Sequence, residues 1–437
     1  MNLPFRFTPD ARTPRPIPES EVRAALDRLV RDAEGPAAFL GCGRSDPTEV
    51  EDLVRGLPAR FRKVLVLGIG GSGLGAQAAL EALRPVHAAP DAREVRILSN
   101  LDPVSVAAAM DWFDPADTLL NPVTKSGTTV ETLTQFALFA DRIRREAGPA
   151  GLREGIVITT DPDRGALRRV ARALGCPTLP VPPKVGGRFS VLTPVGTFPI
   201  RAAGHDLRRL LAGADQVFRQ LEGRDLDHPS VQAARTQVAH MLGGSHARVI
   251  WAYCDRLASF GDWFCQLWGE SLGKPRGDGA LGQQPVRAIG STDQHSLLQL
   301  FMEGAPDKHL TFLTVGGPRP SLKVPDLSDL DPDLKEFAGR DVFEVFEALR
   351  SGTMAGLIEA GRPVARIHVP TLDEEALGAL FAHFEVETAL AGYLLGIDPF
   401  DQPGVEAGKR FAHGLLGRPG MEDLGRRARA ILGEEEA

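Results

Sequence analysis

Six short motifs in this sequence group residues that can hold an anion or move a proton. They are "GIGGSGLG" (68–75), "TKSGTTVET" (124–132), "GGRFS" (186–190), "GESLGK" (269–274), "DQHSLLQL" (293–300) and "FDQPGVEAGK" (400–409). Glycines and hydroxyl groups ahead of a helix offer N–H and O–H donors to a phosphate. A carboxylate, an arginine, a histidine and a lysine can supply acid–base catalysis. Together the motifs indicate chemistry on a phosphorylated substrate.

The first motif also fits the dinucleotide pattern G-x-G-x-x-G, from Gly68 to Gly73. That interpretation requires an acid at the end of the following strand, where it would bind a ribose. The strand instead ends in Ser99 and Asn100, and Asp102 comes only after the turn. We therefore favour a small phosphate here, with Gly71 and Ser72 as donors, and keep a nicotinamide-dependent oxidoreductase as a rival.

The second motif is a denser candidate for anion binding. It places Thr124, Lys125, Ser126, Thr128 and Thr129 directly before a predicted helix. A single hydroxyl group would be enough to cap that helix. Several hydroxyl groups with a lysine and a glycine favour a phosphate cradle instead.

The remaining motifs supply candidates for proton transfer. Arg188 lies on a glycine turn, where its guanidinium can stabilise negative charge on oxygen. Glu270 lies in an otherwise apolar helix and suits a general base, although a surface pair with Lys274 four residues on is an equal alternative. His295 follows a predicted strand. Gln402 and Lys409 are seven residues apart, and this spacing predicts that they share one helix face.

The elements that must position these residues alternate along the chain. Apolar runs predict strands at 63–68, 94–100, 117–123, 155–160 and 178–182, then at 247–254, 284–290, 309–315 and 365–370. Helices are expected at 21–33 (capped by Ser20), 76–83, 104–112, 130–146, 166–174, 259–272, 295–302, 342–359 and 374–395. Continuous apolar strands between helices indicate an α/β fold with parallel sheets. Ligands bind such sheets at the carboxyl ends of the strands.

The pattern stops and restarts, which predicts two similar units in tandem. We expect an N-terminal helical segment (1–60), a first α/β domain (61–205), a helical connection (206–245), a second domain (246–415) and a C-terminal tail (416–437). The Pro- and Asp-rich stretch 316–341 is expected to be a surface excursion, because the strand pattern resumes after it.

Composition excludes several classes of protein. The chain has 437 residues, of which 43% are hydrophobic and 24% charged, as in a soluble protein of two or three domains. A net charge of -7 argues against nucleic-acid binding, and no apolar run is long enough for a membrane span. The four scattered cysteines fit a cytoplasmic protein, and we expect neither a metal nor another cofactor.

In this order, the six motifs resemble those of the bacterial glucose-6-phosphate isomerase (phosphoglucose isomerase) family, and the resemblance covers most of the chain, from Lys63 to His413. The resemblance implies two sugar-isomerase (SIS) domains, a sugar phosphate substrate, a role in glycolysis and gluconeogenesis, and a homodimer with its active site at the subunit interface.

The resemblance also implies roles for individual residues. Glu270 matches the base that moves a proton between C2 and C1, and Arg188 matches the group that stabilises the enediolate. His295, from the partner subunit, and Lys409 match the groups that open the sugar ring. Gln402 matches a substrate contact. The phosphate contacts would be Ser72, Thr124, Lys125, Ser126 and Thr129.

The chain departs from the family pattern at four places without losing a catalytic side chain. These are Thr124, the pair Ser126-Gly127, Asp293 and Pro403. Two further rivals stay open: a dual glucose/mannose phosphate isomerase, and a non-catalytic SIS module that binds a phosphosugar and regulates a partner.

Overall fold

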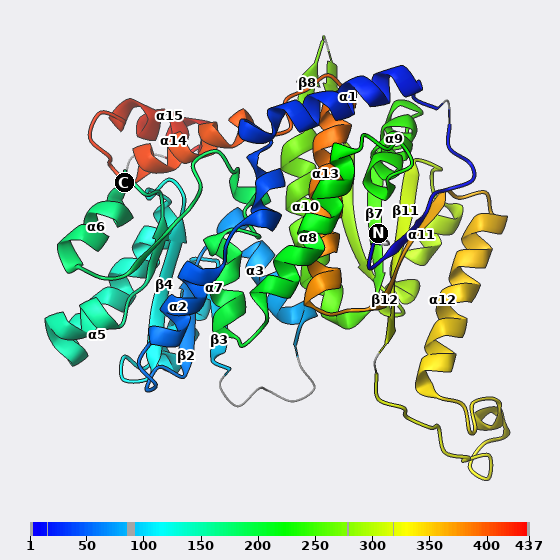
Figure 1. The fold of residues 1–437 in the computed structure, drawn as a ribbon, viewed down its shortest axis with the longest axis horizontal. Helices are drawn as coiled ribbons and strands as arrows, with labels where there is room; N and C mark the ends of the chain where they lie inside the picture. The colour runs from blue at the N-terminus through cyan, green and yellow to red at the C-terminus, as the bar shows by residue number, and fades with distance from the viewer. Residues whose placement is uncertain (1–2, 15, 85–91, 278, 318, 435–437) are drawn as a thin grey trace.

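Two five-stranded sheets organise the molecule and lie side by side with helices between them (Figure 1). The computed structural model describes residues 3–14, 16–84, 92–277, 279–317 and 319–434. The strands of the first sheet are β2 (Lys63–Leu67), β3 (Glu94–Leu98), β4 (Thr118–Thr124), β5 (Ile158–Thr160) and β6 (Thr178–Pro180). They run parallel in the order β3-β2-β4-β5-β6.

The second sheet repeats this plan with one addition. Its strands are β1 (Arg6–Thr8), β7 (Ala247–Tyr253), β10 (Gln284–Ile289), β11 (Lys308–Gly317) and β12 (Val364–Thr371). They follow the order β1-β12-β11-β7-β10, and only β1 is antiparallel to its neighbour. A short hairpin of β8 (Lys274–Arg276) and β9 (Gly279–Leu281) stands apart. Neither β1 nor the hairpin was predicted.

The helices follow the alternation expected from the sequence. In the first half they are α1 (Glu19–Arg31), α2 (Thr48–Gly56), α3 (Leu74–Ala82), α4 (Pro103–Trp112), α5 (Val130–Glu154), α6 (Ala166–Leu174) and α7 (Pro194–Ala202). In the second half they are α8 (Leu207–Glu222), α9 (Pro229–Leu242), α10 (Ala258–Leu272), α11 (Leu298–Glu303), α12 (Val342–Glu359), α13 (Glu374–Leu394), α14 (Glu406–Leu415) and α15 (Glu422–Leu432).

Alternate residues of each strand point to opposite faces, and both faces are apolar because both are covered. Val64 and Val66 of β2 pack into a central core shared with α3, α8, α10 and α13, whereas Leu65 and Leu67 face a cluster under α4, α5 and α6. In the second sheet Trp251 belongs to a third cluster, under α11 and α12. The α/β prediction of two parallel sheets with added terminal helices is therefore confirmed, and the proposed domain boundaries stay a prediction.

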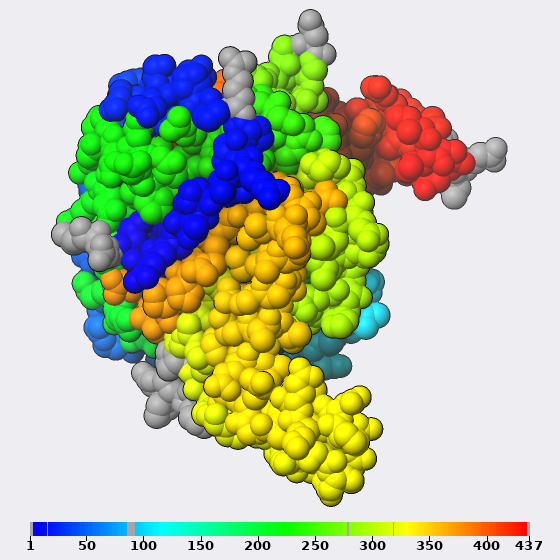
Figure 2. Space-filling view, turned by 90° about the vertical axis from the view of Figure 1, so that its right-hand side faces the viewer, coloured from blue at the N-terminus to red at the C-terminus, as the bar shows by residue number. Residues whose placement is uncertain are grey.

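Two local predictions were wrong. The first helix begins at Glu19 after Pro18, and Ser20 is not its cap. The predicted helix 295–302 is a 3₁₀ turn over Thr292–His295 followed by the short α11. The excursion at 316–341 does project from the body as a largely exposed arm (Figures 1 and 2). None of the described helices is both long and apolar enough to span a membrane.

Candidate active site

The glycine-rich loop leaves β2 as a single 3₁₀ turn, Gly70–Ser72, and leads directly into α3. The loop is too tight for side chains: a Cβ on Gly68 would lie 2.3 Å from the carbonyl oxygen of Ser72. A Cβ on Gly71 would likewise lie 2.3 Å from the backbone of Gly187. Glycine therefore lets this loop pack against the turn that carries Arg188.

The hydroxyl-rich loop follows β4, which pairs directly with β2, so the two loops leave the same edge of the sheet. Thr124 Oγ1 lies 2.7 Å from Thr129 Oγ1 and 3.3 Å from Ser126 Oγ. Ser126 Oγ also accepts the backbone N–H of Thr128 at 3.2 Å. Helix α5 begins at Val130 without a side-chain cap, and its first N–H groups keep the capacity to bind an anion.

Lys125 connects this loop to the arginine turn. Its Nζ donates to the carbonyl oxygen of Val185 at 2.9 Å. Burial lowers the pKa of the Lys125 ammonium, Asp161 opposes that shift, and Arg164 adds to it. The two loops and the arginine turn are thus joined by contacts that the spacing of the sequence does not reveal.

Arg188 is buried, and every nitrogen of its guanidinium has a partner. Nε donates to Ser271 Oγ at 2.7 Å, and Nη2 donates to the carbonyl oxygens of Pro399 and Asp401. Nη1 contacts Gln402 Oε1 at 2.8 Å and Glu270 Oε2 at 3.4 Å. Burial lowers the pKa of this guanidinium, but Glu270 and two aspartates oppose the shift. One cation therefore holds the candidate base and the Gln402 loop together.

Glu270 lies near the end of α10 and is more exposed than the tryptophans of that helix. Trp263 and Trp268 are buried, whereas the Glu270 side chain is 32% exposed. Its Oε1 accepts from Gln266 Nε2 at 3.0 Å, one helical turn earlier. A Cβ on Gly70 would lie 3.0 Å from the same Nε2, so Gln266 bridges the glycine loop and the carboxylate.

A cavity of about 580 Å³ opens in front of Glu270. It is lined by Gly269, Glu270, Gly273, Lys274, Pro275, Gln402, Pro403, Gly404 and Val405. This volume is suitable for a small polar ligand such as a sugar phosphate. Lys274 does not pair with Glu270, which was the alternative drawn from the sequence; its Nζ bonds Asp401 instead.

Two predicted residues lie outside this group in the single chain. His295 is exposed, and its turn contacts α12 through Gln294, which donates to the carbonyl oxygen of Leu349 at 3.2 Å. The Asp293 carboxylate accepts from the backbone N–H of Ile289, at the end of β10, and from Ser296 Oγ, just after the turn. Lys409 lies on α14 and pairs with Glu406 at 2.8 Å.

The prediction that Lys409 and Gln402 share a helix face was wrong. Gln402 precedes the 3₁₀ turn Pro403–Val405, and α14 begins only at Glu406.

Sequence reasoning missed two residues of this group. Gln266 contacts the carboxylate, and Ser271 accepts from Arg188. The only available signal for Gln266 was its position four residues before Glu270. Ser271 is next to Glu270, but nothing in the sequence brings it to an arginine that lies far away along the chain.

The structure also bears on cofactor binding. Asp102, the acid that a dinucleotide site would need, accepts the N–H groups of Val104 and Ser105 at 3.0 Å as the cap of α4. It is therefore occupied, and the geometry favours a phosphate over a dinucleotide. A carboxylate on a cavity wall, a cation beside it, and two anion-binding loops joined to them through Gln266 and the arginine turn can hold a phosphorylated sugar and move a proton on its carbon chain.

Similar proteins point the same way. A family model described as "Phosphoglucose isomerase" matches residues 58–313 and 339–423. The chain is 39% identical over 409 residues to a glucose-6-phosphate isomerase of Rubrobacter xylanophilus, covering 91% of this chain and 93% of that protein. It is 38% identical to a glucose-6-phosphate isomerase of Carboxydothermus hydrogenoformans, covering 86% of this chain and 83% of that protein.

Solved structures share the fold. A hypothetical protein from Thermus thermophilus matches with a TM-score of 0.84 and 32% identity, covering 94% of this chain and all of that one. A glucose-6-phosphate isomerase from Chlamydia trachomatis matches with a TM-score of 0.73 and 20% identity, covering 95% of this chain and 82% of that one.

Proposed function

The chain belongs to the phosphoglucose isomerase family, and from this premise we propose that it interconverts D-glucose 6-phosphate and D-fructose 6-phosphate. The enzyme is then an aldose–ketose isomerase. The observation that carries the proposal within the molecule is the contact of Glu270 with Arg188 at one wall of a cavity. A carboxylate beside a fixed cation is what a proton transfer through an enediolate requires.

The proposed chemistry begins after the sugar ring has opened. The Glu270 carboxylate removes the proton from C2, which leaves a cis-enediolate; the O2 hydroxyl proton passes to O1, and Glu270 returns the first proton to C1. Arg188 stabilises the charge that develops on the sugar oxygens, since its Nη1 faces the cavity-lining side chains Glu270 and Gln402. Gln266 holds the carboxylate from the other side, at Oε1.

The phosphate is proposed to bind between the two loops that leave β2 and β4. Ser72 and the backbone of Gly71 contribute from one loop, and Thr124, Lys125, Ser126, Thr128 and Thr129 contribute from the other. Hydroxyl donors, a cation and uncapped helix N–H groups are the usual partners of a phosphate. Anchoring the phosphate orients C1 and C2 relative to the base.

Ring opening is assigned to His295 and Lys409, which would pass a proton between the ring oxygen and O1. Among the described contacts, none joins either residue to Glu270 or Arg188. We therefore propose a homodimer in which His295 serves the active site of the partner subunit. The chain would act in the cytoplasm, in glycolysis and gluconeogenesis.

Two features of the surface support the homodimer. The turn of His295 rests on α12, and α12 follows the projecting arm (Figure 2). The arm and α12 expose a run of large apolar side chains: Leu322, Leu327, Leu330, Leu334, Phe337, Val342, Leu349 and Ile358. Such a concentration of exposed apolar surface is typical of a protein interface.

A coupled assay tests the proposed reaction. Fructose 6-phosphate is supplied with glucose-6-phosphate dehydrogenase and NADP⁺, so that NADPH reports glucose 6-phosphate. We expect steady NADPH production that depends on this protein, and its absence would refute the proposal. Proton NMR of mannose 6-phosphate incubated with the protein separately tests the dual-isomerase alternative, for which we expect no conversion.

A further inference from the structure

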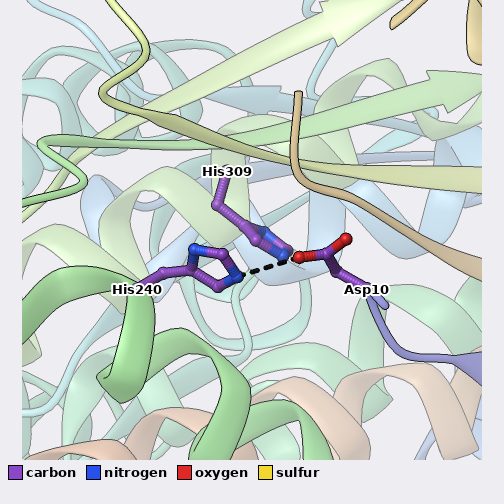
Figure 3. A group of neighbouring side chains, drawn as sticks. All are labelled: Asp10, His240 and His309. Atoms are coloured by element: carbon purple, nitrogen blue, oxygen red, sulfur yellow. Dashed lines mark hydrogen bonds and ion pairs between the residues drawn. The ribbon is translucent and has the colours of Figure 1, made fainter. Parts of the chain in front are cut away.

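A second cluster of chemistry-bearing side chains lies in the interior, apart from the cavity in front of Glu270. Asp10 follows β1, His240 lies near the end of α9, and His309 is the second residue of β11 (Figure 3). All three are buried, with exposures of 8%, 5% and 0%. None of them lines the cavity in front of Glu270. We propose that these residues form a binding site for a divalent transition metal ion of the zinc class.

The distances fit coordination. His240 Nε2 lies 3.1 Å from Asp10 Oδ2, and one ligand atom from each of the three residues lies within 4.8 Å of the others. Zinc bonds imidazole nitrogen and carboxylate oxygen at about 2.0–2.2 Å, so two ligands of a tetrahedral site stand roughly 3.4 Å apart. One pair is already close to that separation, and because all three ligand atoms lie within 4.8 Å of one another, the third needs a shift of at most about 1.4 Å.

The type of ligand selects the metal. Two imidazoles and one carboxylate suit zinc and other divalent first-row transition metals, whereas magnesium and calcium prefer sites made entirely of oxygen ligands. Three protein ligands leave a fourth tetrahedral position for water. The set carries a single negative charge, from Asp10, so a bound divalent ion is partly neutralised.

The surroundings of His309 supply the outer contact that metal-bound histidines need. An imidazole that binds a metal through one ring nitrogen donates the N–H of its other ring nitrogen to an acceptor. The Gln237 amide lies 2.7 Å from His309 Nδ1, and among the described residues its Oε1 has no hydrogen-bond partner. Exchanging the amide oxygen and nitrogen, which are assigned from the hydrogen-bond network, lets Oε1 accept the Nδ1–H. Nε2 is then the ligand atom.

The nearby positive charge does not oppose this arrangement strongly. Arg248 Nη1 lies 3.3 Å from His309 Nδ1 and can only donate, so a protonated Nδ1 requires Nη1 to give up this contact and keep its bond to Thr311 Oγ1; the guanidinium is also paired with Glu387 Oε1 at 2.9 Å. Both members of that pair are buried, so the pair adds no net charge beside the site. The arginine also donates to Thr311, which fixes it on β11.

The site would fasten the N-terminal segment to the second sheet. Strand β1 has only three residues and pairs with β12 at the sheet edge. Asp10 extends this attachment by reaching α9 and β11, two elements far away in the sequence. Because ligands from separate elements come together only in the folded chain, metal binding would stabilise the fold.

The test uses the full-length isomerase. Protein stripped with EDTA is exchanged into metal-free buffer, given slightly more than one equivalent of zinc chloride, desalted, and analysed by ICP mass spectrometry and thermal unfolding. We expect one zinc per chain and a higher Tm. Asp10→Asn and His240→Gln should weaken zinc binding by at least about 100-fold, since even changes to outer contacts cost about 10–100-fold. His246→Gln, an exposed histidine outside the cluster, is the matched control.

Two results would overturn the proposal: no zinc retained by the wild-type chain, or equal retention by the Asp10→Asn and His240→Gln variants. In either case the cluster is only a hydrogen-bonded contact. If a variant fails to fold, cobalt(II) added to the stripped wild-type protein keeps the test decisive. We expect visible d–d bands of a low-coordinate site that one equivalent of zinc abolishes, and their absence would also overturn the proposal.

Discussion

The position of the Glu270 carboxylate is set from both sides. Gln266 donates to one oxygen at 3.0 Å, and Arg188 contacts the other at 3.4 Å. Arg188 in turn holds Ser271, the carbonyl oxygens of the Gln402 loop and Gln402 itself. A base that must reach two neighbouring carbons needs an orientation that persists through the reaction. We infer that the arginine both positions the base and stabilises the charge that the base creates.

The base assignment predicts the kinetics of Glu270→Gln. Glutamine keeps the size of the side chain and can still contact Arg188, but it cannot accept the C2 proton. We expect kcat to fall by about 100- to 10,000-fold with little change in KM. Steady-state kinetics in the coupled assay measures both constants. Glu49→Gln, at an exposed position on α2, should behave as wild type, and a fully active Glu270→Gln variant would refute the assignment.

The phosphate cradle predicts a change in KM rather than in kcat, the reverse of what is expected for Glu270→Gln. Ser126→Ala removes a hydroxyl at the centre of the loop, and Lys125→Ala removes its cation. Because the phosphate is held equally before and during the proton transfer, KM for the sugar phosphate should rise several-fold while kcat changes less. Ser20→Ala, at an exposed position on α1, serves as the matched hydroxyl control. An unchanged KM in both cradle variants would count against phosphate binding there.

At the scale of elements, the helices between the sheets approach one another closely enough to require glycine. A Cβ on Gly213 of α8 would lie 1.8 Å from the carbonyl oxygen of Glu375, and one on Gly378 of α13 would lie 1.8 Å from that of Leu210. Each glycine thus faces the backbone of the other helix. The two helices belong to the central core that joins both sheets.

This close contact predicts a large effect of Gly378→Ala. The methyl group can be accommodated only if α8 and α13 separate, and overpacking of this kind costs about 1–3 kcal/mol or more. We expect a lower Tm and a lower denaturation midpoint. Gly352→Ala is the control, because α12 offers open space there and alanine favours a helix by about 0.8–1 kcal/mol. Equal stability of the two variants would contradict the packing argument.

Elements with strong periodicity were predictable, and elements without it were not. The strands β2, β4, β7 and β11 are long apolar runs, and they lie where the sequence predicted them. Strand β1 has three residues, too few for a pattern, and forms only because β12 offers an edge. The same holds for the candidate site. Its motifs could be recognised in the sequence. The contacts of Gln266 and Ser271 and the pairing of Lys274 with Asp401 could not be predicted, because they depend on tertiary packing.

At the scale of the whole molecule, one chain holds two parts of the proposed machinery that do not meet. The base and its arginine lie at the cavity, while His295 is exposed on a turn that contacts α12. In a symmetric dimer each subunit would supply His295 to the active site of its partner and receive the partner's histidine in return, so both active sites would be complete. The exposed apolar side chains of the arm and α12 would be buried by the same association.

Sharing of His295 between subunits predicts that two inactive variants restore activity when they are combined. Glu270→Gln and His295→Gln homodimers each have two defective sites. In a mixed dimer one site has lost both groups, but the other keeps Glu270 from one chain and His295 from its partner. Random mixing yields half mixed dimers with one intact site each, so about one quarter of wild-type activity should return.

Co-expression with two different affinity tags isolates the mixed dimer, which should have about half of wild-type activity per dimer. Each homodimer prepared with the same tags gives the baseline. If the mixed dimer were as inactive as its parents, His295 would have to act within its own chain or not at all, because only a histidine that crosses the interface can be supplied by a subunit whose base has been removed.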